Sequence, residues 1–383
     1  MPQAKLAQLS QALEQRAAQQ LLRVPVTLER YDGRLLVVAG KSYLNFSAND
    51  YLGLATEPQV LQAFAEGAAR FGAGSSGSPL VTGQHAVHQQ LSDSLADWLG
   101  VERVLLFSSG FAANQAMLLS LSNKTDTLLL DKLSHASLID AALHSEAGLK
   151  RFAHNDIAAL QNLLGRVSQP MVVTEGVFSM DGDSPDLPAM LALCQRYDAP
   201  LLLDDAHGLG VLGPQGRGTA AAQGLSQSAL FCTMANFGKA LGSGGAFIGG
   251  SKTVLDYIEQ FGRHYIYSTA LPPPLCAAVL KSIELCRADN WRRDKLYSNI
   301  VLFRTLAADL ALLNSQSAIQ GVVLGSSERA LAVSNQLKQQ GIWLSAIRPP
   351  TVPQGSARLR ITLSAAHTAD DITLLVQQLR QVL

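Results

Sequence analysis

The stretch PLLLDDAHG occupies residues 200–208. Its three consecutive leucines predict a short strand buried on both faces, as in a parallel sheet that helices cover. Asp204 and His207 stand where this strand ends. A carboxylate at the end of a buried strand is costly unless a cation or a hydrogen-bond donor meets it. A protonated pyridine nitrogen would be such a partner, and an aspartate that only caps a turn is the structural alternative.

Short apolar runs alternate with helical patterns on both sides of this stretch. The predicted strands are Arg103–Phe107, Thr127–Leu130, Met171–Thr174, Pro200–Asp204 and Ala229–Met234, and the predicted helices between them are 112–121, 137–143, 157–164 and 187–196. This alternation predicts an α/β fold whose mostly parallel sheet is covered by helices. Because such sheets bind ligands at the carboxyl ends of their strands, we expect the functional residues there.

Changes of pattern along the chain predict three segments. Residues 1–45 are expected to form an N-terminal arm with a helix over 6–22, residues 46–285 a large domain, and residues 286–383 a smaller C-terminal α+β domain. A long helical region over 274–310 leads into the small domain. Its strands are predicted near 319–324 and 358–363, and its helices over 329–340 and 370–383.

Composition excludes several classes of function. The chain has 383 residues, of which 48% are hydrophobic and 16% are charged, and its formal net charge is zero. That balance gives no support to nucleic-acid binding or to binding at anionic membranes. The start of the chain lacks the apolar region of a signal peptide, and no run has the length of a membrane span. The four cysteines are scattered, which suits buried thiols in the cytoplasm better than a metal site.

One lysine stands among glycines in NFGKALG, residues 236–242, just after the predicted strand that ends at Met234. Apolar neighbours would desolvate the amine of Lys239, and a desolvated lysine amine is what Schiff-base chemistry requires. A structural lysine at a strand end is the alternative. Two matches to G-x-G-x-x-G, at 72–77 and 208–213, do not open helices, so we reject a dinucleotide site and expect permissive turns near a ligand.

Other strand ends carry further candidates. Gly110 and Phe111 lie between a strand and a helix, where free backbone N–H groups and the helix dipole favour phosphate. His135 follows the next strand and could stack on a planar ring, although a single histidine is more often structural. Ser179 lies in TEGVFSMDGD, residues 174–183, and could bond a ring substituent. The acidic residues of that stretch have no histidine or cysteine nearby in sequence, so no metal site is predicted.

Together these residues describe a site for pyridoxal phosphate: a phosphate turn, a stacking histidine, an aspartate for the ring nitrogen and a Schiff-base lysine. The chain resembles the α-oxoamine synthases, pyridoxal-phosphate enzymes with the aspartate-aminotransferase fold (fold type I), over nearly its whole length. The segments AIRPPTVP (346–353) and ARLRITLSAAH (357–367) are similar to those of members that condense L-alanine with a pimeloyl thioester and release CO2.

The resemblance implies a role for each matching residue. Lys239 would bind the cofactor and take the Cα proton, with Asp204, His207 and His135 as the other catalytic residues. The cofactor would also contact Gly110, Phe111, Ser179, Asn236, Ser268 and Thr269, the last two from a partner subunit, and the substrates would contact Arg23, Asn49, His135, Thr351 and Arg360. Asn236 stands where the family usually has a threonine, and its amide can also donate a hydrogen bond.

The resemblance also implies a cytoplasmic homodimer with shared sites, whose acyl donor is pimeloyl-CoA or a pimeloyl carrier protein. Three alternatives remain. A glycine acetyltransferase would lack the IRPP run at 347–350, and a 5-aminolevulinate synthase would carry an arginine where this chain has Pro79. A regulator that binds the cofactor without catalysis is the alternative from another class, and the intact Lys239, Asp204, His207 and Arg360 argue against it.

Overall fold

The computed structural model describes residues 2–383, and the chain divides into two compact units. Unit 1 comprises Met1–Ala48, Met180–Gly182 and Leu296–Leu383, and unit 2 comprises Asn49–Ser179 and Asp183–Lys295. This division differs from the expected one. The N-terminal residues share a unit with the C-terminal part instead of forming a separate arm, and the expected boundary at 285/286 falls inside helix α11 (Pro273–Ala288).

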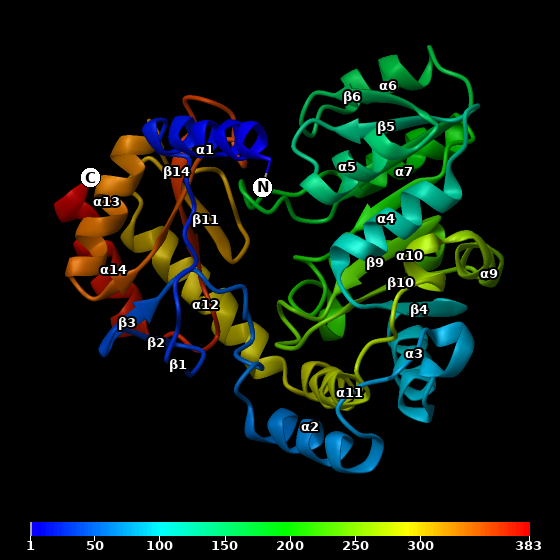
Figure 1. The fold of residues 1–383 in the computed structure, drawn as a ribbon, viewed down its shortest axis with the longest axis horizontal. Helices are drawn as coiled ribbons and strands as arrows, with labels where there is room; N and C mark the ends of the chain where they lie inside the picture. The colour runs from blue at the N-terminus through cyan, green and yellow to red at the C-terminus, as the bar shows by residue number, and fades with distance from the viewer. Residues whose placement is uncertain (1) are drawn as a thin grey trace. The chain divides into compact units, whose positions relative to one another are not determined.

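Unit 2 is built on a seven-stranded sheet with the order β4-β10-β9-β8-β7-β5-β6 (Figure 1). Its strands are β4 (Arg103–Phe107), β5 (Thr127–Asp131), β6 (Gly148–Phe152), β7 (Pro170–Glu175), β8 (Leu201–Asp204), β9 (Cys232–Asn236) and β10 (Ala246–Gly250). The five strands from β9 to β6 are parallel, and β10 runs antiparallel to both of its neighbours. The prediction of a mostly parallel sheet is therefore confirmed.

Helices cover both faces of this sheet because successive strand residues point to opposite sides. Leu202 packs in one apolar cluster with α4 (Gly110–Leu121), α5 (Ala136–His144), α9 (Lys252–Phe261) and α10 (Arg263–Ile266). Leu201 and Leu203 pack in the other cluster with α6 (Ile157–Leu164), α7 (Leu187–Arg196) and α8 (Thr219–Ala222). Burying a leucine side chain contributes roughly 1.5–3 kcal/mol, so the run that ends at Asp204 is held firmly on both sides.

The remaining helices of unit 2 are α2 (Pro58–Phe71), α3 (Ala86–Leu99) and α11. Unit 1 contains a four-stranded sheet, β1-β2-β3-β12, and a three-stranded sheet, β11-β14-β13. Its strands are β1 (Arg30–Tyr31), β2 (Leu35–Val38), β3 (Lys41–Asn45), β11 (Ile319–Gly325), β12 (Ile342–Trp343), β13 (Ser345–Ile347) and β14 (Ala357–Thr362). Its helices are α1 (Gln3–Ala18), α13 (Ser327–Gln339), α14 (Ala369–Val382) and most of α12 (Asn290–Leu306).

Several elements differ from the sequence expectation, among them the strand expected over Ala229–Met234, which is β9 (Cys232–Asn236). The helical region predicted over 274–310 consists of two helices, α11 and α12. The arm helix ends at Ala18 and not at Leu22. Strand β6 was not predicted because Lys150 and Arg151 interrupt its apolar pattern; both are exposed on an edge strand, where charged residues are common.

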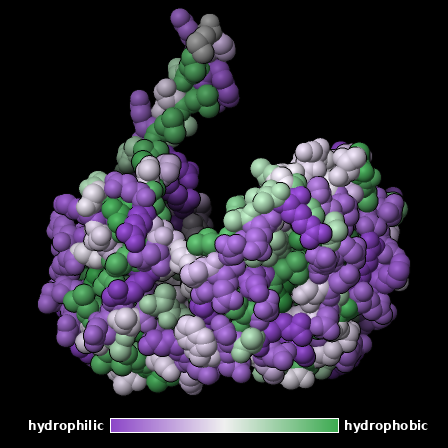
Figure 2. All heavy atoms as spheres, turned by 90° about the horizontal axis from the view of Figure 1, so that it is seen from below, coloured by the Kyte–Doolittle hydropathy of each residue, from purple (hydrophilic) through white to green (hydrophobic). Residues whose placement is uncertain are grey.

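Helix α1 buries no residue, although Leu6, Leu9 and Leu13 recur at helical spacing along it. Figure 2 shows green, hydrophobic atoms beside purple ones along the segment that stands out at the top of the view. Within residues 2–383, no helix is both long enough and apolar enough to cross a membrane.

Candidate active site

Lys239 lies in the turn that joins β9 to β10, as the sequence predicted. Backbone hydrogen bonds fix this turn: the Phe237 N–H donates to the Gly245 carbonyl at 2.9 Å, and the Gly242 N–H donates to the Lys239 carbonyl at 2.9 Å. The turn places Lys239 Nζ 2.9 Å from Nε2 of His207. The lysine amine therefore lies beside a group that can exchange a proton with it.

His207 follows β8 and is bonded on both ring nitrogens. Its Nδ1 lies 2.6 Å from the hydroxyl of Tyr51, a side chain that is only 1% exposed, and the Tyr51 hydroxyl also donates to Oδ1 of Asn49 at 3.3 Å. Tyr51, His207 and Lys239 thus form a continuous hydrogen-bonded chain. Because the bond at one imidazole nitrogen decides which nitrogen carries the proton, Tyr51 controls the tautomer that His207 presents to Lys239.

Asp204 ends β8 and is 5% exposed. Its Oδ1 accepts a hydrogen bond from the N–H of Ala206 at 3.0 Å, and its Oδ2 accepts one from the side-chain amide of Asn114 at 2.8 Å. The same Asn114 nitrogen lies 2.9 Å from the hydroxyl of Ser137. Neutral donors therefore orient the carboxylate, and a protonated ring nitrogen would add the positive charge that a buried carboxylate requires.

His135 caps the N-terminal end of α5, where its Nδ1 accepts a hydrogen bond from the backbone N–H of Ser137 at 3.2 Å. Burial and the nearby charge of Lys239 lower the pKa of His135, although Asp204 acts in the opposite direction. A neutral imidazole suits stacking on an aromatic ring. The backbone N–H of His135 donates to Glu175 Oε1. Burial, together with the charge of Asp204, raises the pKa of Glu175 well above its usual range.

Ser109 caps α4, and its hydroxyl accepts the N–H of Ala112 at 3.1 Å. Gly110 and Phe111 are the first residues of that helix, whose N-terminal end favours an anion. A Cβ on Gly110 would lie 3.6 Å from the Asn236 side chain, so the helix terminus and Asn236 are neighbours. Thr233, the other candidate for the missing threonine, donates instead to Gln227 at 2.8 Å.

These residues surround one cavity of about 180 Å³ within unit 2. Its lining contains Gly110, Phe111, Asn114, His135, Ser137, Glu175, Asp204, Ala206, His207, Met234, Asn236 and Lys239. Among residues 2–383, the buried oxygens Oδ1 of Asn114 and Oδ1 of Asn236 have no hydrogen-bond partner. The cavity contains the anion-favouring terminus of α4, the Lys239 amine and the Asp204 carboxylate, which fit the phosphate, the aldehyde and the ring nitrogen of pyridoxal phosphate.

Comparison with known proteins identifies the family. A family model described as aminotransferase class I and II matches residues 41–379. The 8-amino-7-oxononanoate synthase of Photobacterium profundum is 48% identical over 382 residues, which cover 98% of this chain and 96% of that protein. The chain belongs to the 8-amino-7-oxononanoate synthase family of class I and II aminotransferases.

Solved structures agree with this family. A serine palmitoyltransferase variant from S. paucimobilis, with a bound PLP–myriocin aldimine, is 28% identical with a TM-score of 0.93, covering 100% of this chain and 98% of that one. An 8-amino-7-oxononanoate synthase from Francisella tularensis is 31% identical with a TM-score of 0.78, covering 88% of this chain and 98% of that one. The predicted fold type I architecture is confirmed, and the chain is a pyridoxal-phosphate-dependent acyltransferase.

The structure brings seven of the predicted site residues of this family member into the cavity: Gly110, Phe111, His135, Asp204, His207, Asn236 and Lys239. Ser179, Asn49, Ser268 and Thr269 belong to unit 2 but do not line the cavity. Arg23, Thr351 and Arg360 belong to unit 1. There, Arg23 donates to the Thr351 hydroxyl at 2.9 Å, and the buried Arg360 donates to Thr362 at 2.8 Å from the middle strand of a sheet.

Sequence reasoning missed Tyr51, Asn114, Ser137 and Glu175. Two of them had a local signal. Asn114 lies in the first turns of the helix that follows the predicted phosphate turn, and Glu175 ends the strand beside that of Asp204, with which it pairs in register. Tyr51 and Ser137 reach the site only because the fold brings them next to His207 and Asn114. Nothing in their local sequence indicated this position.

Proposed function

We propose that this protein condenses L-alanine with pimeloyl-CoA or a pimeloyl carrier protein, giving 8-amino-7-oxononanoate, CO2 and the free thiol of the donor. The observation that carries this proposal is the Tyr51–His207–Lys239 hydrogen-bonded chain, whose His207 and Lys239 line the same cavity as Asp204. Bound pyridoxal phosphate would supply an aldehyde for amines and an electron sink for carbanion charge. The site residues must then orient the alanine, remove its Cα proton and hold the acyl donor.

Four residues of the cavity have a defined task in this proposal. Asp204 keeps a proton on the ring nitrogen, which makes the electron sink effective. Lys239 accepts the Cα proton and later returns one, and His207 at 2.9 Å shares that proton through its Nε2. His135 stacks on the ring as a neutral imidazole, in agreement with its lowered pKa, which burial causes.

Substrate recognition is assigned to residues of unit 1 and to Asn49. Arg360 binds the alanine carboxylate with its planar guanidinium, and Asn49 assists. Arg23 and Thr351 contact the acyl substrate, and their mutual hydrogen bond at 2.9 Å supports a common role. The buried position of Arg360 on β14 supports a fixed orientation for its guanidinium.

We also propose that the enzyme is a cytoplasmic homodimer in which Ser268 and Thr269 contact the phosphate of the partner's cofactor. Thr269 is exposed and Ser268 is half-buried, so both remain accessible to a second chain. The uncovered leucines of α1 supply apolar surface that a second chain would bury. A carrier protein as acyl donor would be a further, transient partner.

The direct test is turnover with defined substrate pairs. The purified protein, loaded with pyridoxal phosphate, should release CO2 and form 8-amino-7-oxononanoate from L-alanine with pimeloyl-CoA or with the pimeloyl carrier protein, as mass spectrometry can show. Glycine with acetyl-CoA and glycine with succinyl-CoA test the two sister activities. Preferred turnover of either glycine pair, or cofactor binding without any turnover, would overturn the proposal.

A further inference from the structure

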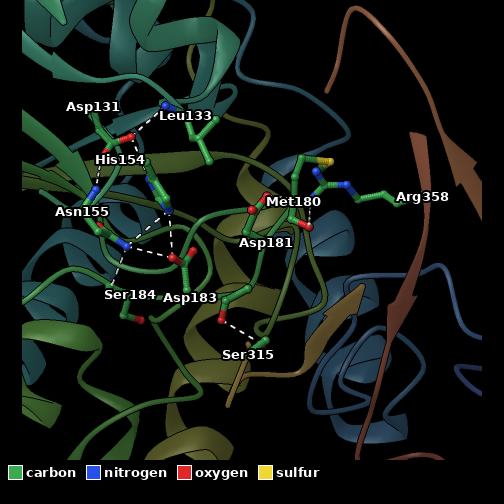
Figure 3. Close-up of polar contacts among 11 residues, drawn as sticks. Asp131, Leu133, His154, Asn155, Met180, Asp181, Asp183, Ser184, Ser315 and Arg358 are labelled. Carbon is green, nitrogen blue, oxygen red and sulfur yellow. Dashed lines mark hydrogen bonds and ion pairs between the residues drawn. The ribbon is translucent and has the colours of Figure 1, made fainter. Parts of the chain in front are cut away.

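His154 lies between two carboxylates at the carboxyl-terminal edge of the unit 2 sheet (Figure 3). Its Nδ1 is 2.9 Å from Oδ1 of Asp131, and its Nε2 is 2.8 Å from Oδ2 of Asp183. An ionised carboxylate only accepts hydrogen bonds, so both ring nitrogens donate when the two carboxyls are ionised, and the ring is then an imidazolium. The amide nitrogen of Asn155 also lies 3.3 Å from Nε2. Burial lowers the pKa of His154, but the hydrogen bonds and charges of Asp131 and Asp183 outweigh burial and raise it to about 10.

We propose that His154 is a positioning residue: as an imidazolium bonded to Asp131 and Asp183, it sets the positions of His135 and Ser179 in the active site. The inference rests on the proposed function, in which His135 stacks on the cofactor ring, and on the family resemblance, which implies that Ser179 also contacts the cofactor. His154 itself does not line the cavity. It acts through two loops that do carry site residues.

The first loop is reached through Asp131, which is fully buried at the end of β5. Besides the bond from His154, Oδ1 of Asp131 accepts the N–H of Leu133 at 2.7 Å, and Oδ2 accepts the N–H of Asn155 at 2.9 Å. Leu133 lies two residues before His135. Asp131 therefore fixes the start of the loop that carries the stacking histidine, and His154 supplies the positive charge that its buried carboxylate requires.

The second loop is reached through Asp183. The carbonyl of Asp183 accepts the N–H of Phe178 at 2.9 Å, which closes the turn that contains Ser179. The ring of Phe178 meets the ring of His154 edge to face, with centroids 4.4 Å apart at 88°. His154 thus contacts both ends of the turn, and Asn155 adds a bond to Asp183 at 2.8 Å.

The middle of the same turn, residues 180–182, belongs to unit 1 and is bonded separately there. Arg358 donates to Asp181 at 2.7 Å, and the Ser315 hydroxyl donates to the Gly182 carbonyl at 2.9 Å (Figure 3). Within unit 2, Ser179 directly follows Phe178 in the turn that the His154 contacts hold. Removing these contacts therefore loosens the part of the turn that carries Ser179.

The experiment compares His154→Gln with Ser179→Ala and with the double variant in the full-length protein loaded with pyridoxal phosphate. A serine hydroxyl that donates to the phenolic oxygen favours the deprotonated chromophore, so its loss raises the pKa seen in an absorbance titration. We expect His154→Gln to raise this pKa in the same direction and to lower kcat about tenfold, with the KM for alanine within about twofold. In the Ser179→Ala background, His154→Gln should add no further pKa shift.

Two further variants provide a control and a substitute test. His144→Gln, at an exposed histidine of α5, is the matched control and should leave pKa and kcat unchanged. If His154→Gln does not fold, Asp183→Asn removes the charge on the turn and should shift the pKa in the same direction. An unchanged chromophore pKa, or an equal added shift in the Ser179→Ala background, would refute the positioning role.

Hydrogen exchange of the protein without cofactor separates this inference from the proposed function. His154→Gln should speed exchange in the peptides that cover residues 132–136 and 176–184, and His144→Gln should not. A protein that binds no pyridoxal phosphate would refute the proposed function, and the exchange data would still decide whether His154 orders the two loops. Native exchange in both loops would refute the inference even in an active enzyme.

Discussion

Single residues decide whether the Lys239 turn can form. Gly242 has a φ of +60°, and a Cβ at this position would lie 2.2 Å from the backbone nitrogen of Ala55. Only glycine combines this conformation with so close an approach. The glycines around Lys239 thus serve the backbone geometry that places the amine 2.9 Å from His207.

Replacing Lys239 with alanine should abolish condensation, because no other amine takes part in the Tyr51–His207–Lys239 chain. Borohydride reduction of the wild-type holoenzyme, followed by peptide mapping, should place the cofactor on Lys239. Lys281→Ala, which removes a lysine paired with Glu284 on α11, is the control and should retain activity. A cofactor label on any other lysine would contradict the assignment.

Arg360→Lys should raise the KM for alanine and also lower kcat. Lysine keeps the charge but loses the planar pair of donors, so the carboxylate is held in a less defined orientation and the Cα–H bond is aligned less often for proton removal. Arg380→Lys is the control in the same unit, because Arg380 pairs with the exposed Asp309. Native alanine kinetics with a lowered melting temperature in Arg360→Lys would assign Arg360 a structural role instead.

At the scale of elements, the loop after β8 shows why a glycine motif without a dinucleotide site is present. A Cβ on Gly208 would lie 2.1 Å from both Asp205 Oδ1 and Thr219 Oγ1. Thr219 donates to Asp205 at 2.6 Å, and burial raises the pKa of Asp205 to about 7 despite the Thr219 bonds. The glycine admits this buried hydrogen-bonded pair next to the strand end that holds Asp204.

Gly208→Ala should therefore lower the free energy of unfolding by about 1–3 kcal/mol, the typical cost of overpacking a well-packed site. Denaturant unfolding followed by circular dichroism would measure the loss. Gly74→Ala is the matched control, since Gly74, like Gly208, lacks a left-handed φ and a Cβ there meets nothing within 4 Å. An equal loss in both variants would show that the Asp205 contact is not the cause.

The side chain of His154 follows β6 and bonds to the end of β5 and to the turn after β7. These bonds predict that the stability of the protein depends on pH. The pKa of His154 is raised from 6.5 to about 10 in the folded protein. The folded state therefore binds more protons than the unfolded state between these values, so the contribution of His154 is complete below pH 6.5 and is lost as pH rises towards 10. The difference in unfolding free energy between wild type and His154→Gln should shrink across that range. A difference that stays constant from pH 6 to about 10 would contradict the imidazolium assignment.

The sequence predicted the elements and strand-end residues that depend on local pattern. Asp204, Lys239, His135 and the phosphate turn were found because each lies at the end of an apolar run or within a few residues of it. Tyr51 and Asn114 were missed because they bond to partners 156 and 90 residues away, His207 and Asp204, which no periodicity reports. The role of His154 was missed for the same reason, because its partners Asp131 and Asp183 lie at the end of β5 and in the turn after β7.

At the scale of the whole molecule, the proposed homodimer predicts complementation between two inactive chains. A Lys239→Ala chain and a chain with disabling changes at Ser268 and Thr269 should form heterodimers in which one site takes both intact parts. Random mixing should then restore roughly a quarter of wild-type activity. Heterodimers that form, as native mass spectrometry would show, but remain inactive would exclude sharing of the site.

The four cysteines have a practical consequence for such measurements. All of them are buried free thiols, and burial raises the pKa of Cys194, Cys232 and Cys276 to about 12 and that of Cys286 to about 11. Maleimide reagents react with exposed thiolates, so the native protein should remain almost unlabelled at neutral pH. A single cysteine introduced at the exposed Leu143 would then be the preferred attachment point for a spin label or a fluorophore, and none of the native cysteines would need to be replaced.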